Sequence, residues 1–438
     1  MYLHGTSRIN EQGHLEIGGC DTAQLAKQYG TPLYVYDEAS IREKCHAFHR
    51  AFQESGFSYQ VAYASKAFLC MEMCRVAREE NMSLDVVSGG ELYTALQAGF
   101  PASRIHFHGN NKTEEEIIMA LQADIGCFVV DNFFEMEVLH DLAQQYGKIV
   151  NILIRVTPGV EAHTHEYITT GQDDSKFGFG VSTGQAMQAI QIALGKSNYN
   201  VLGIHSHIGS QIFETAGFVR AIEVLYNFLE EIREQTGYVV TVLNVGGGFG
   251  IRYTEADTPL TLETYVHAVT DAVREQFTRN NYPLPEIWIE PGRSIVGDTG
   301  TTIYTVGAVK NIPGIRKYVS VDGGMTDNLR PALYGARYEA ILANRGKAAA
   351  EEVVSIAGKC CESGDMLIWD IELPQVAPGD LLAISCTGAY GYSMANNYNR
   401  IRRPAVVFAK DGASQVVVER ETYENIIGND RIHIKELV

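Results

Sequence analysis

The chain has 438 residues, and 35 Lys and Arg stand against 53 Asp and Glu, for a formal net charge of -18. Hydrophobic residues make up 45% and charged residues 20%, which are globular values and exclude disorder as a description of the whole chain. The acidic balance argues against a nucleic-acid partner, because phosphate backbones bind basic faces, but it allows a small anionic ligand. At roughly 100–200 residues per domain, the length predicts two or three domains.

The chain carries no pattern of a membrane or secreted protein. No stretch approaches the roughly 18 uninterrupted apolar residues of a membrane span, and the N-terminal MYLHGTSRINEQGHLEIGG shows no signal pattern. We therefore expect a cytoplasmic protein with no membrane partner. The eight cysteines are irregularly spaced and form no CxxC pair, which argues against structural zinc and against a disulfide framework.

Strand-like and helical patterns alternate from about residue 31 to residue 292. Helical patterns cover about 37–53, 112–124, 217–237 and 261–280. Strands that alternate with helices pair in parallel through crossovers, so about eight such units predict a closed (β/α)₈ barrel over 31–292, with an open doubly wound sheet as the alternative. The predicted strands are 59–65, 84–88, 105–108, 127–131, 150–156, 201–207, 242–245 and 287–290.

The pattern changes after Gly292. Residues 293–438 hold short β-type runs that turn residues separate, such as TTIYTVGAVKN, EEVVSIAGK, LLAISC and AVVFAKDG, and helical periodicity is weak. The first 30 residues also lack a helical pattern. We therefore expect a second domain, all-β and sandwich- or barrel-like, made of residues 293–438 together with residues 1–30.

Lys66 ends the first predicted barrel strand, in VAYASKAF. A lone lysine at a strand end is usually a solvated surface residue. In a β/α barrel, however, catalytic groups lie at the C-terminal ends of the strands. Flanked by Tyr63, Ala64 and Ala67, Lys66 would be partly desolvated, which favours the neutral amine that forms Schiff bases.

Glycines and charges follow the seventh and eighth predicted strands. The run Asn244-Val-Gly-Gly-Gly-Phe-Gly250 has neither GxGxxG nor P-loop spacing, which argues against a dinucleotide or ATP site. It is either a tight turn or a phosphate loop, and its position favours phosphate. Glu290 and Arg293 in EPGR read as a salt bridge, or as partners of a protonated ring nitrogen and an anion.

Three HxH pairs suggest a rival function, a metal-dependent barrel hydrolase. The pairs are His106/His108, His163/His165 and His205/His207. The other predicted strand ends carry Lys66, Ser88, Asp131 and Glu290, a poor match for a two-metal cage, so we expect no metal. His207, in HSHIGSQ, is placed to stack on a planar cofactor.

Candidate polar residues also lie in the second domain. Cys361 precedes Glu362 in KCCESGD, and a carboxylate beside a thiol favours the protonated thiol, a poor nucleophile but a plausible proton donor. Arg330 and Tyr334 are four residues apart, so on a helix they would share a face and grip a carboxylate. Tyr390 is flanked by glycines and is equally readable as part of a turn.

Together these segments resemble the fold-type III pyridoxal-phosphate decarboxylases, and within them the diaminopimelate branch. The resemblance runs nearly end to end, and residues 155–180, CESGD and RPALYGA are together its most specific parts. One departure is Ser206, where the family often has Cys between the two histidines. The matching segments are YASKA, DVVSGGEL, FHGNNK, RVTPGVEAHTHEYITTGQDDSKFGFG, HSHIGSQI, GGGFG, EPGR, DGGMTDNLRPALYGARY, CESGD and TGAYGYSMANNYN.

The resemblance implies a role for each candidate residue. Lys66 would carry pyridoxal 5'-phosphate, His207 would stack on the ring, and Glu290 would bond the ring nitrogen. Cys361 would be the proton donor, contributed across the interface of a homodimer with shared active sites. The phosphate would be held by Ser210, Gly246, Gly247 and Gly248, the backbone of Gly292 and Arg293, and the Tyr390 hydroxyl. The substrate would be bound by Arg293, Arg330, Tyr334, Glu362 and Tyr390.

The implied activity is loss of the carboxylate at the D-centre of meso-2,6-diaminopimelate, which yields L-lysine and CO₂. Three alternatives stay open from the sequence. The first is a decarboxylase of the same fold for ornithine, arginine, lysine or carboxynorspermidine. The second is the metal-dependent hydrolase. The third is a catalytically inactive regulatory homologue, although every chemical position named above is present.

Overall fold

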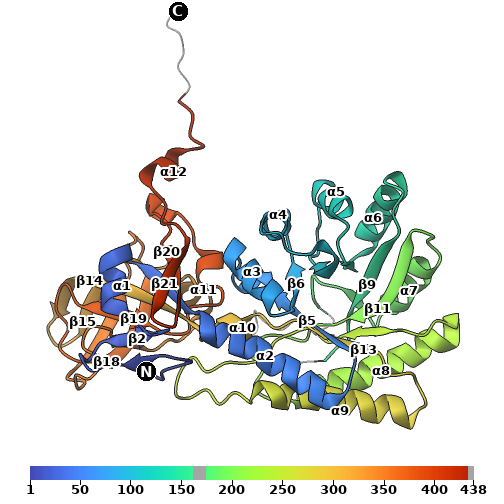
Figure 1. The fold of residues 1–438 in the computed structure, drawn as a ribbon, viewed down its shortest axis with the longest axis horizontal. Coiled ribbons are helices and arrows are strands. Elements are labelled where there is room, and N and C mark those ends of the chain that lie inside the picture. The colour runs from blue at the N-terminus through green and yellow to red at the C-terminus, as the bar shows by residue number, and fades with distance from the viewer. Residues whose placement is uncertain (161–173, 433–438) are drawn as a thin grey trace, which may run out of the picture. The chain divides into compact units, whose positions relative to one another are not determined.

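The computed structural model describes residues 1–160 and 174–432, and within them the chain forms two compact units (Figure 1). One unit comprises Ile41–Arg252 and Ala256–Gly297. The other comprises Met1–Ser40, Tyr253–Glu255 and Asp298–Val438. The domain bounds expected from the sequence, 31–292 and 1–30 with 293–438, stay a prediction beside this division.

The unit that begins at Ile41 contains a closed barrel of eight parallel strands within the described residues. The strands follow the order β5-β6-β7-β8-β9-β11-β12-β13, and β13 pairs with β5 to close the ring. The predicted barrel is therefore confirmed, and the open sheet is not found. The strands are β5 (Tyr59–Ala64), β6 (Ser83–Val86), β7 (Ile105–Phe107), β8 (Cys127–Val130), β9 (Val150–Thr157), β11 (Tyr199–His205), β12 (Val242–Asn244) and β13 (Glu286–Ile289), with β10 (Phe179–Gly180) added beside β9.

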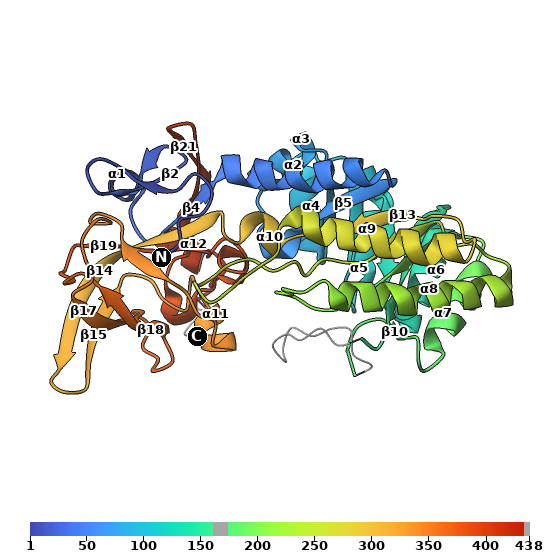
Figure 2. The same cartoon turned by 90° about the horizontal axis from the view of Figure 1, so that it is seen from below.

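Helices connect the barrel strands, and Figure 2 shows α8 and α9 side by side along the barrel. Polar side chains begin several of them: Ser88 accepts from the Glu91 N–H, and Thr113 and Glu116 form a capping box. The helices expected near 112–124, 217–237 and 261–280 are found as α5, α8 and α9. The set is α2 (Glu38–Ser55), α3 (Met71–Glu79), α4 (Gly89–Gln97), α5 (Glu114–Ala123), α6 (Phe133–Gln145), α7 (Gln185–Leu194), α8 (Ala216–Thr236), α9 (Leu262–Arg279) and α10 (Arg293–Val296).

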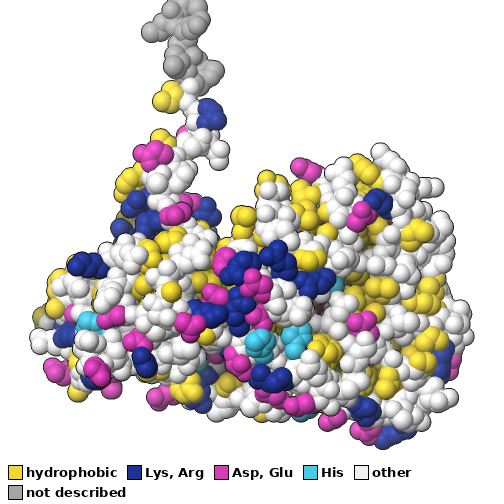
Figure 3. All heavy atoms as spheres, viewed as in Figure 1, with side chains coloured by type: hydrophobic (Ala, Val, Ile, Leu, Met, Phe, Trp, Pro, Cys, Tyr) yellow, Lys and Arg dark blue, Asp and Glu magenta, His cyan; other side chains and the backbone are white. Residues whose placement is uncertain are grey.

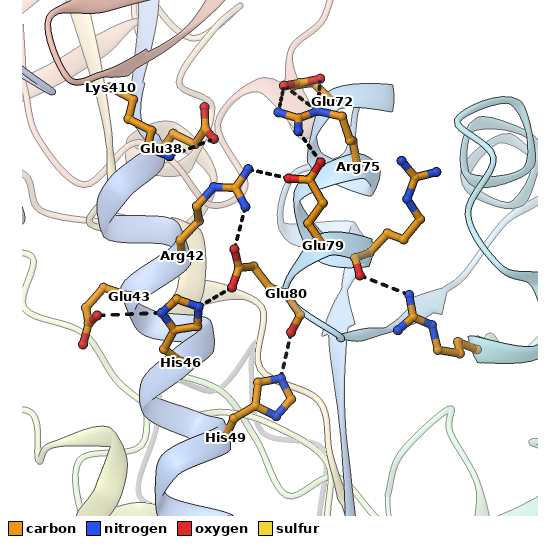
Figure 4. A network of polar contacts seen from close by, with 12 residues as sticks. Glu38, Arg42, Glu43, His46, His49, Glu72, Arg75, Glu79, Glu80 and Lys410 are labelled. Carbon is orange, nitrogen blue, oxygen red and sulfur yellow. Dashed lines mark hydrogen bonds and ion pairs between the residues drawn. The ribbon is translucent and has the colours of Figure 1, made fainter.

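An ion-pair network fastens α3 to α2 (Figure 4). Arg42 on α2 contacts Glu79 at 2.8 Å and Glu80 at 2.5 Å, and His46 reaches the other oxygen of Glu80 at 2.5 Å. His49 contacts the backbone oxygen of Glu80 at 2.9 Å. The network therefore fixes the C-terminal end of the helix that follows the first barrel strand.

The other unit is rich in β-sheet, as expected. Its largest sheet runs β18-β17-β15-β14-β4-β20-β21, and β19 pairs with both β14 and β16. Strand β4 pairs with β14 and β20, so the chain before the barrel supplies a strand to this sheet. The strands of the sheet are β4 (Leu33–Asp37), β14 (Gly300–Ile312), β15 (Arg316–Val321), β16 (Ala340–Leu342), β17 (Glu352–Ala357), β18 (Met366–Leu373), β19 (Leu381–Ile384), β20 (Ala405–Lys410) and β21 (Ala413–Val418).

The first 30 residues differ from expectation. They form a small separate sheet of β1 (Arg8–Ile9), β2 (Leu15–Ile17) and β3 (Cys20–Asp21), followed by helix α1 (Thr22–Tyr29), which the sequence analysis missed. Asp21 caps α1 by accepting from the Ala23 N–H, and Gly30 ends it. Two further short helices, α11 (Arg330–Tyr334) and α12 (Tyr423–Ile427), complete this unit.

Charges of both signs alternate on the face drawn in Figure 3, where basic and acidic side chains lie beside one another. No helix among the described residues is long and apolar enough to cross a membrane.

Candidate active site

Lys66 lies directly after the first barrel strand. A single 3₁₀ turn, Ser65–Ala67, follows β5, and α3 begins at Met71. The expected desolvation is not found: the Lys66 side chain is exposed while its neighbours Ala64 and Ala67 are buried, because the turn carries it past the strand end. Its positive charge still acts on the pKa values of Asp85, Glu91 and His207, so these groups share its end of the barrel.

Glu290 follows β13, the strand that pairs with β5, and is 7% exposed. Its Oε1 accepts a hydrogen bond from Asn244 Nδ2 at 2.6 Å and lies 3.0 Å from His108 Nε2. Its Oε2 lies 3.0 Å from His205 Nε2. Burial alone would raise the pKa of Glu290, but the neighbouring imidazoles of His108 and His205 and their hydrogen bonds hold it well below its ordinary value. Glu290 is therefore an anion.

The histidines around Glu290 differ in charge. Burial lowers the pKa of His108, but Asp85, 3.6 Å away, and Glu290 outweigh it and leave the pKa raised. Burial lowers the pKa of His205 to about 4, so His205 is neutral and serves Glu290 as a hydrogen-bond donor. Burial also lowers the pKa of His106, to about 3, and its ring stacks on Trp288 at 4.4 Å.

Within the described part of the chain, His106, His108 and His205 therefore do not form the two-metal cage of the rival hydrolase. His108, His205 and Glu290 lie close enough to share one ion. They already contact one another, however: the cation His108 and the neutral donor His205 each lie 3.0 Å from an oxygen of the Glu290 anion. His106 lies away from them, against Trp288. His163 and His165 lie outside the described residues.

His207 and the glycine loop fix one another. The Gly247 N–H donates to His207 Nδ1 at 3.2 Å, which assigns the ring proton to Nε2. Burial and then the nearby Lys66 charge hold the pKa of His207 well below its ordinary value, so the ring is neutral. A neutral imidazole with its orientation fixed suits stacking on a planar ring.

Close backbone packing explains the three glycines. Gly246 has φ +72°, which favours glycine. A Cβ at Gly247 would lie 2.1 Å from the backbone carbonyl oxygen of Glu290, and a Cβ at Gly248 would lie 2.3 Å from the backbone carbonyl oxygen of Gly209. The Gly246 N–H donates to Asn244 Oδ1, while the Gly248 N–H has no partner among the described residues. Gly248 is thus the glycine whose backbone is available to a phosphate.

Ser210 and Arg293 meet beside this loop. Arg293 Nη2 donates to Ser210 Oγ at 3.0 Å, and the Arg293 side chain is buried at the start of α10. A Cβ at Gly292 would lie 3.0 Å from the Ala64 Cβ, so the backbone of the eighth strand end packs tightly on the first. The structure therefore places these barrel candidates at the same end of the barrel.

The remaining candidates lie in the other unit. Arg330 is buried and begins helix α11, which ends at Tyr334, so the two residues lie on one short helix. The guanidinium of Arg330 donates to the Tyr338 hydroxyl at 2.7 Å and lies 4.8 Å from the ring centre of Tyr253. Tyr390 is near enough for its hydroxyl to act on the pKa of Arg330.

The two adjacent cysteines have opposite environments. Cys360 is buried, and its N–H donates to Asp365 at 2.7 Å. Cys361 is exposed, with its N–H donating to Asn399 at 2.8 Å. Glu362 is also exposed and accepts from the Gly364 N–H at 3.1 Å. Of the two adjacent thiols, only that of Cys361 is therefore exposed.

Sequence reasoning missed several buried charges of the barrel. Asp85 on β6 is 3% exposed and faces His108. Glu91 on α4 has its pKa raised to about 7 by burial, although the Val87 N–H donates to it. Arg155 on β9 lies 3.7 Å from Asp131. For Asp85 and Arg155 the available signal was a single charged residue inside an apolar strand, because burying a charge is costly unless it has a partner.

These residues fit pyridoxal phosphate. An exposed amine ends β5, an anionic carboxylate lies at the end of the neighbouring strand β13, and a neutral imidazole stands at the end of β11. The glycine loop presents the unpaired Gly248 N–H where any Cβ would clash. Each protein group that such a cofactor needs is thus present on the barrel.

Comparisons with known proteins agree with this fit. The sequence model described as "Pyridoxal-dependent decarboxylase, pyridoxal binding domain" matches residues 38–297. A protein of Bacillus subtilis named diaminopimelate decarboxylase is 62% identical over 430 residues, which cover 98% of each chain. The structure of diaminopimelate decarboxylase from M. jannaschii in complex with L-lysine superposes with a TM-score of 0.92 at 38% identity, covering 98% of each chain. The chain therefore belongs to the diaminopimelate decarboxylase family of pyridoxal-dependent decarboxylases.

Proposed function

We propose that this chain removes CO₂ from the D-centre of meso-2,6-diaminopimelate and yields L-lysine, with pyridoxal 5'-phosphate as cofactor. The observation that carries the proposal is that exposed Lys66 and anionic Glu290 follow the ends of two neighbouring barrel strands, β5 and β13. A lysine amine and a buried anion are what attachment of the cofactor and pairing with its ring nitrogen require.

Different barrel residues would hold different parts of the cofactor. Lys66 supplies the attachment point, Glu290 pairs with the ring nitrogen, and neutral His207 lies against the ring. Gly248, Ser210 and the backbone of Gly292 and Arg293 face the phosphate, with the Tyr390 hydroxyl and the packing of Gly246 and Gly247 in support. When bound, the cofactor supplies a conjugated ring that accepts the electron pair left by CO₂.

We also propose that Cys361 returns the proton to the carbon that lost CO₂. Its exposure and its position next to Glu362 support this role. Cys361 would act in the active site of a partner subunit, which makes the protein a homodimer with shared sites. A cytoplasmic location is part of the same proposal.

Charge explains the choice of substrate. Diaminopimelate carries a second carboxylate at the end where lysine, ornithine and arginine carry only a cation. Buried Arg330, with Arg293, Tyr334 and Tyr390, suits that carboxylate, and Glu362 suits the ammonium beside it. A site of buried charged donors rejects a ligand that lacks the acceptor, often by about 10⁴-fold.

The test compares kcat/KM for diaminopimelate, lysine, ornithine and arginine on wild type, Arg330→Ala and Arg337→Ala. Arg330→Ala should cost about 2–5 kcal/mol with diaminopimelate and narrow the gap to lysine. Exposed Arg337 lies on the same segment and serves as the matched control, with little change expected. A wild type that prefers one of the monocarboxylates would contradict the diaminopimelate assignment and leave the decarboxylase class standing.

A further inference from the structure

Asn244 connects two parts of the barrel end that otherwise hold different portions of the cofactor. It is the last residue of β12 and is fully buried. Its Oδ1 accepts from the Gly246 N–H at 2.9 Å, and its Nδ2 donates to Glu290 Oε1 at 2.6 Å. One side chain thus bonds both the glycine loop and the carboxylate.

The orientation of the Asn244 amide follows from its partners. A backbone N–H can only donate, so Gly246 must face the amide oxygen. The amide nitrogen then faces Glu290, where an ionised carboxylate can only accept. Rotation of the amide would break both bonds at once, so the two partners hold Asn244 in a single orientation.

The backbone closes the same circuit. The backbone N–H of Glu290 donates to the backbone carbonyl of Gly246 at 2.9 Å. The backbone carbonyl of Asn244 accepts from the Ser206 N–H at 2.8 Å. Gly246, Asn244 and Glu290 therefore form a ring of three contacts across β12 and β13. Without the Asn244 amide, Glu290 Oε1 would keep His108 as its neighbour, and the glycine loop would lose its side-chain anchor.

We propose that Asn244 is a positioning residue for the reaction: it holds the Glu290 carboxylate and the Gly246–Gly248 loop in one fixed geometry, so that the partner of the ring nitrogen and the phosphate loop form a single preformed unit. The inference rests on the proposed function, because it assigns Glu290 to the ring nitrogen. It adds a residue whose hydrogen bonds reach both ends of the cofactor site.

The first test removes the amide but keeps its shape. Asn244→Leu preserves the branched volume, and Asn244→Ala is the second variant. Loss of a hydrogen bond to a charged group should lower kcat about ten- to a hundredfold while KM for diaminopimelate changes less than about threefold. The dissociation constant of pyridoxal phosphate, measured by equilibrium dialysis, should rise, and the visible absorbance band of the bound cofactor should shift.

A double-mutant cycle then asks whether Asn244 acts through Glu290. Glu290→Gln removes the anion, so Asn244→Leu in that background should change kcat less than about twofold. Asn200→Ala is the control, since Asn200 is an exposed strand asparagine that bonds Asn151 at 2.7 Å. It should leave kcat, cofactor binding and the absorbance spectrum unchanged.

Each result decides the matter. An unchanged kcat and spectrum in Asn244→Leu, or equal losses in the wild-type and Glu290→Gln backgrounds, overturns the positioning role alone. A Glu290→Gln enzyme with unchanged kcat overturns the proposed role of Glu290 and the inference with it. If neither Asn244 variant folds, Asn244 serves stability, and the positioning role is overturned as well.

Discussion

The buried ion pair between Lys112 and Glu135 should contribute strongly to the stability of the barrel. Lys112 follows β7 and is 6% exposed, and Glu135 on α6 is 3% exposed. Lys112 Nζ donates to Glu135 Oε1 at 2.7 Å, to the Val129 oxygen at 2.8 Å and to the Gly109 oxygen at 2.9 Å. One ammonium thus joins the loop after β7 to the end of β8 and to α6.

Lys112→Met keeps most of the side-chain volume and removes the charge. It leaves the Glu135 carboxylate buried, with the Asp131 N–H at 3.0 Å as its remaining hydrogen-bond donor among the described residues. Breaking one side of a buried pair costs about 3–5 kcal/mol. Burial raises the pKa of Glu135 and the Lys112 charge opposes that rise. In the variant the folded pKa rises further above the unfolded value of about 4.3, so the loss of stability grows with pH above that value.

Urea unfolding at pH 5 and pH 8 measures the effect. Lys112→Met should lose more stability at pH 8 than at pH 5, and the double variant Lys112→Met/Glu135→Met should recover most of the loss, because no lone charge remains. The control is Lys196→Met, which breaks the pair of Lys196 with the exposed Glu137 at 2.7 Å and should cost less than about 1 kcal/mol. A loss below about 1 kcal/mol in Lys112→Met, or a double variant no more stable than the single one, would refute this reasoning.

Three further predictions concern the cofactor, the dimer and pH. Lys66→Ala should abolish the borohydride-reducible bond between protein and cofactor, and a variant that keeps it at full occupancy would show that another lysine is used. Lys66→Ala and Cys361→Ala proteins, each nearly inactive, should recover about a quarter of wild-type activity when mixed and re-equilibrated, by random assortment of a two-fold dimer; no recovery despite subunit exchange would contradict shared sites. Burial raises the pKa of Asp327 to about 7, although Tyr304 donates to it. The folded state therefore binds the extra proton, and the stability that Asp327 contributes should be lost as pH rises from about 4 to 7. Asp327→Asn should thus lose less stability than wild type across that range, as thermal unfolding would show.

The sequence predicts the barrel well because its strands are buried on both sides. Such strands read as short apolar runs, and the helices between them read as amphipathic segments with recognisable caps. Helix α1 escaped because it spans only eight residues, Thr22–Tyr29, too few for a periodic pattern, although Asp21 and Gly30 mark its ends. Strand β18, Met366–Leu373, escaped because its exposed Trp369 and Asp370 interrupt its apolar pattern.

The candidate site is only partly readable from sequence. Motif residues such as Lys66 and Glu290 stand at strand ends, where position alone suggests chemistry. Asp85 and Arg155 lie inside strands, and which side of the barrel they face depends on the closed ring. Asn244 lies next to the glycine run in the sequence, but its hydrogen bond to Glu290 forms only because β12 and β13 are neighbours in the barrel. The sequence alone therefore does not show which side chains meet across neighbouring strands.

The charges around Glu290 also bear on the protonation of the cofactor ring. Asp85, Asp131 and Glu290 supply three carboxylates, against which stand the two cations His108 and Arg155. Burial raises the pKa of Asp85 and so disfavours its charge, but Glu290 stays ionised because its neighbours favour the anion. The Glu290 anion therefore stabilises a positively charged group beside it more than it stabilises a neutral group. A protonated ring nitrogen is such a group, and protonation makes the ring a stronger electron acceptor. The buried carboxylates of the barrel thus favour the form of the cofactor that decarboxylation needs.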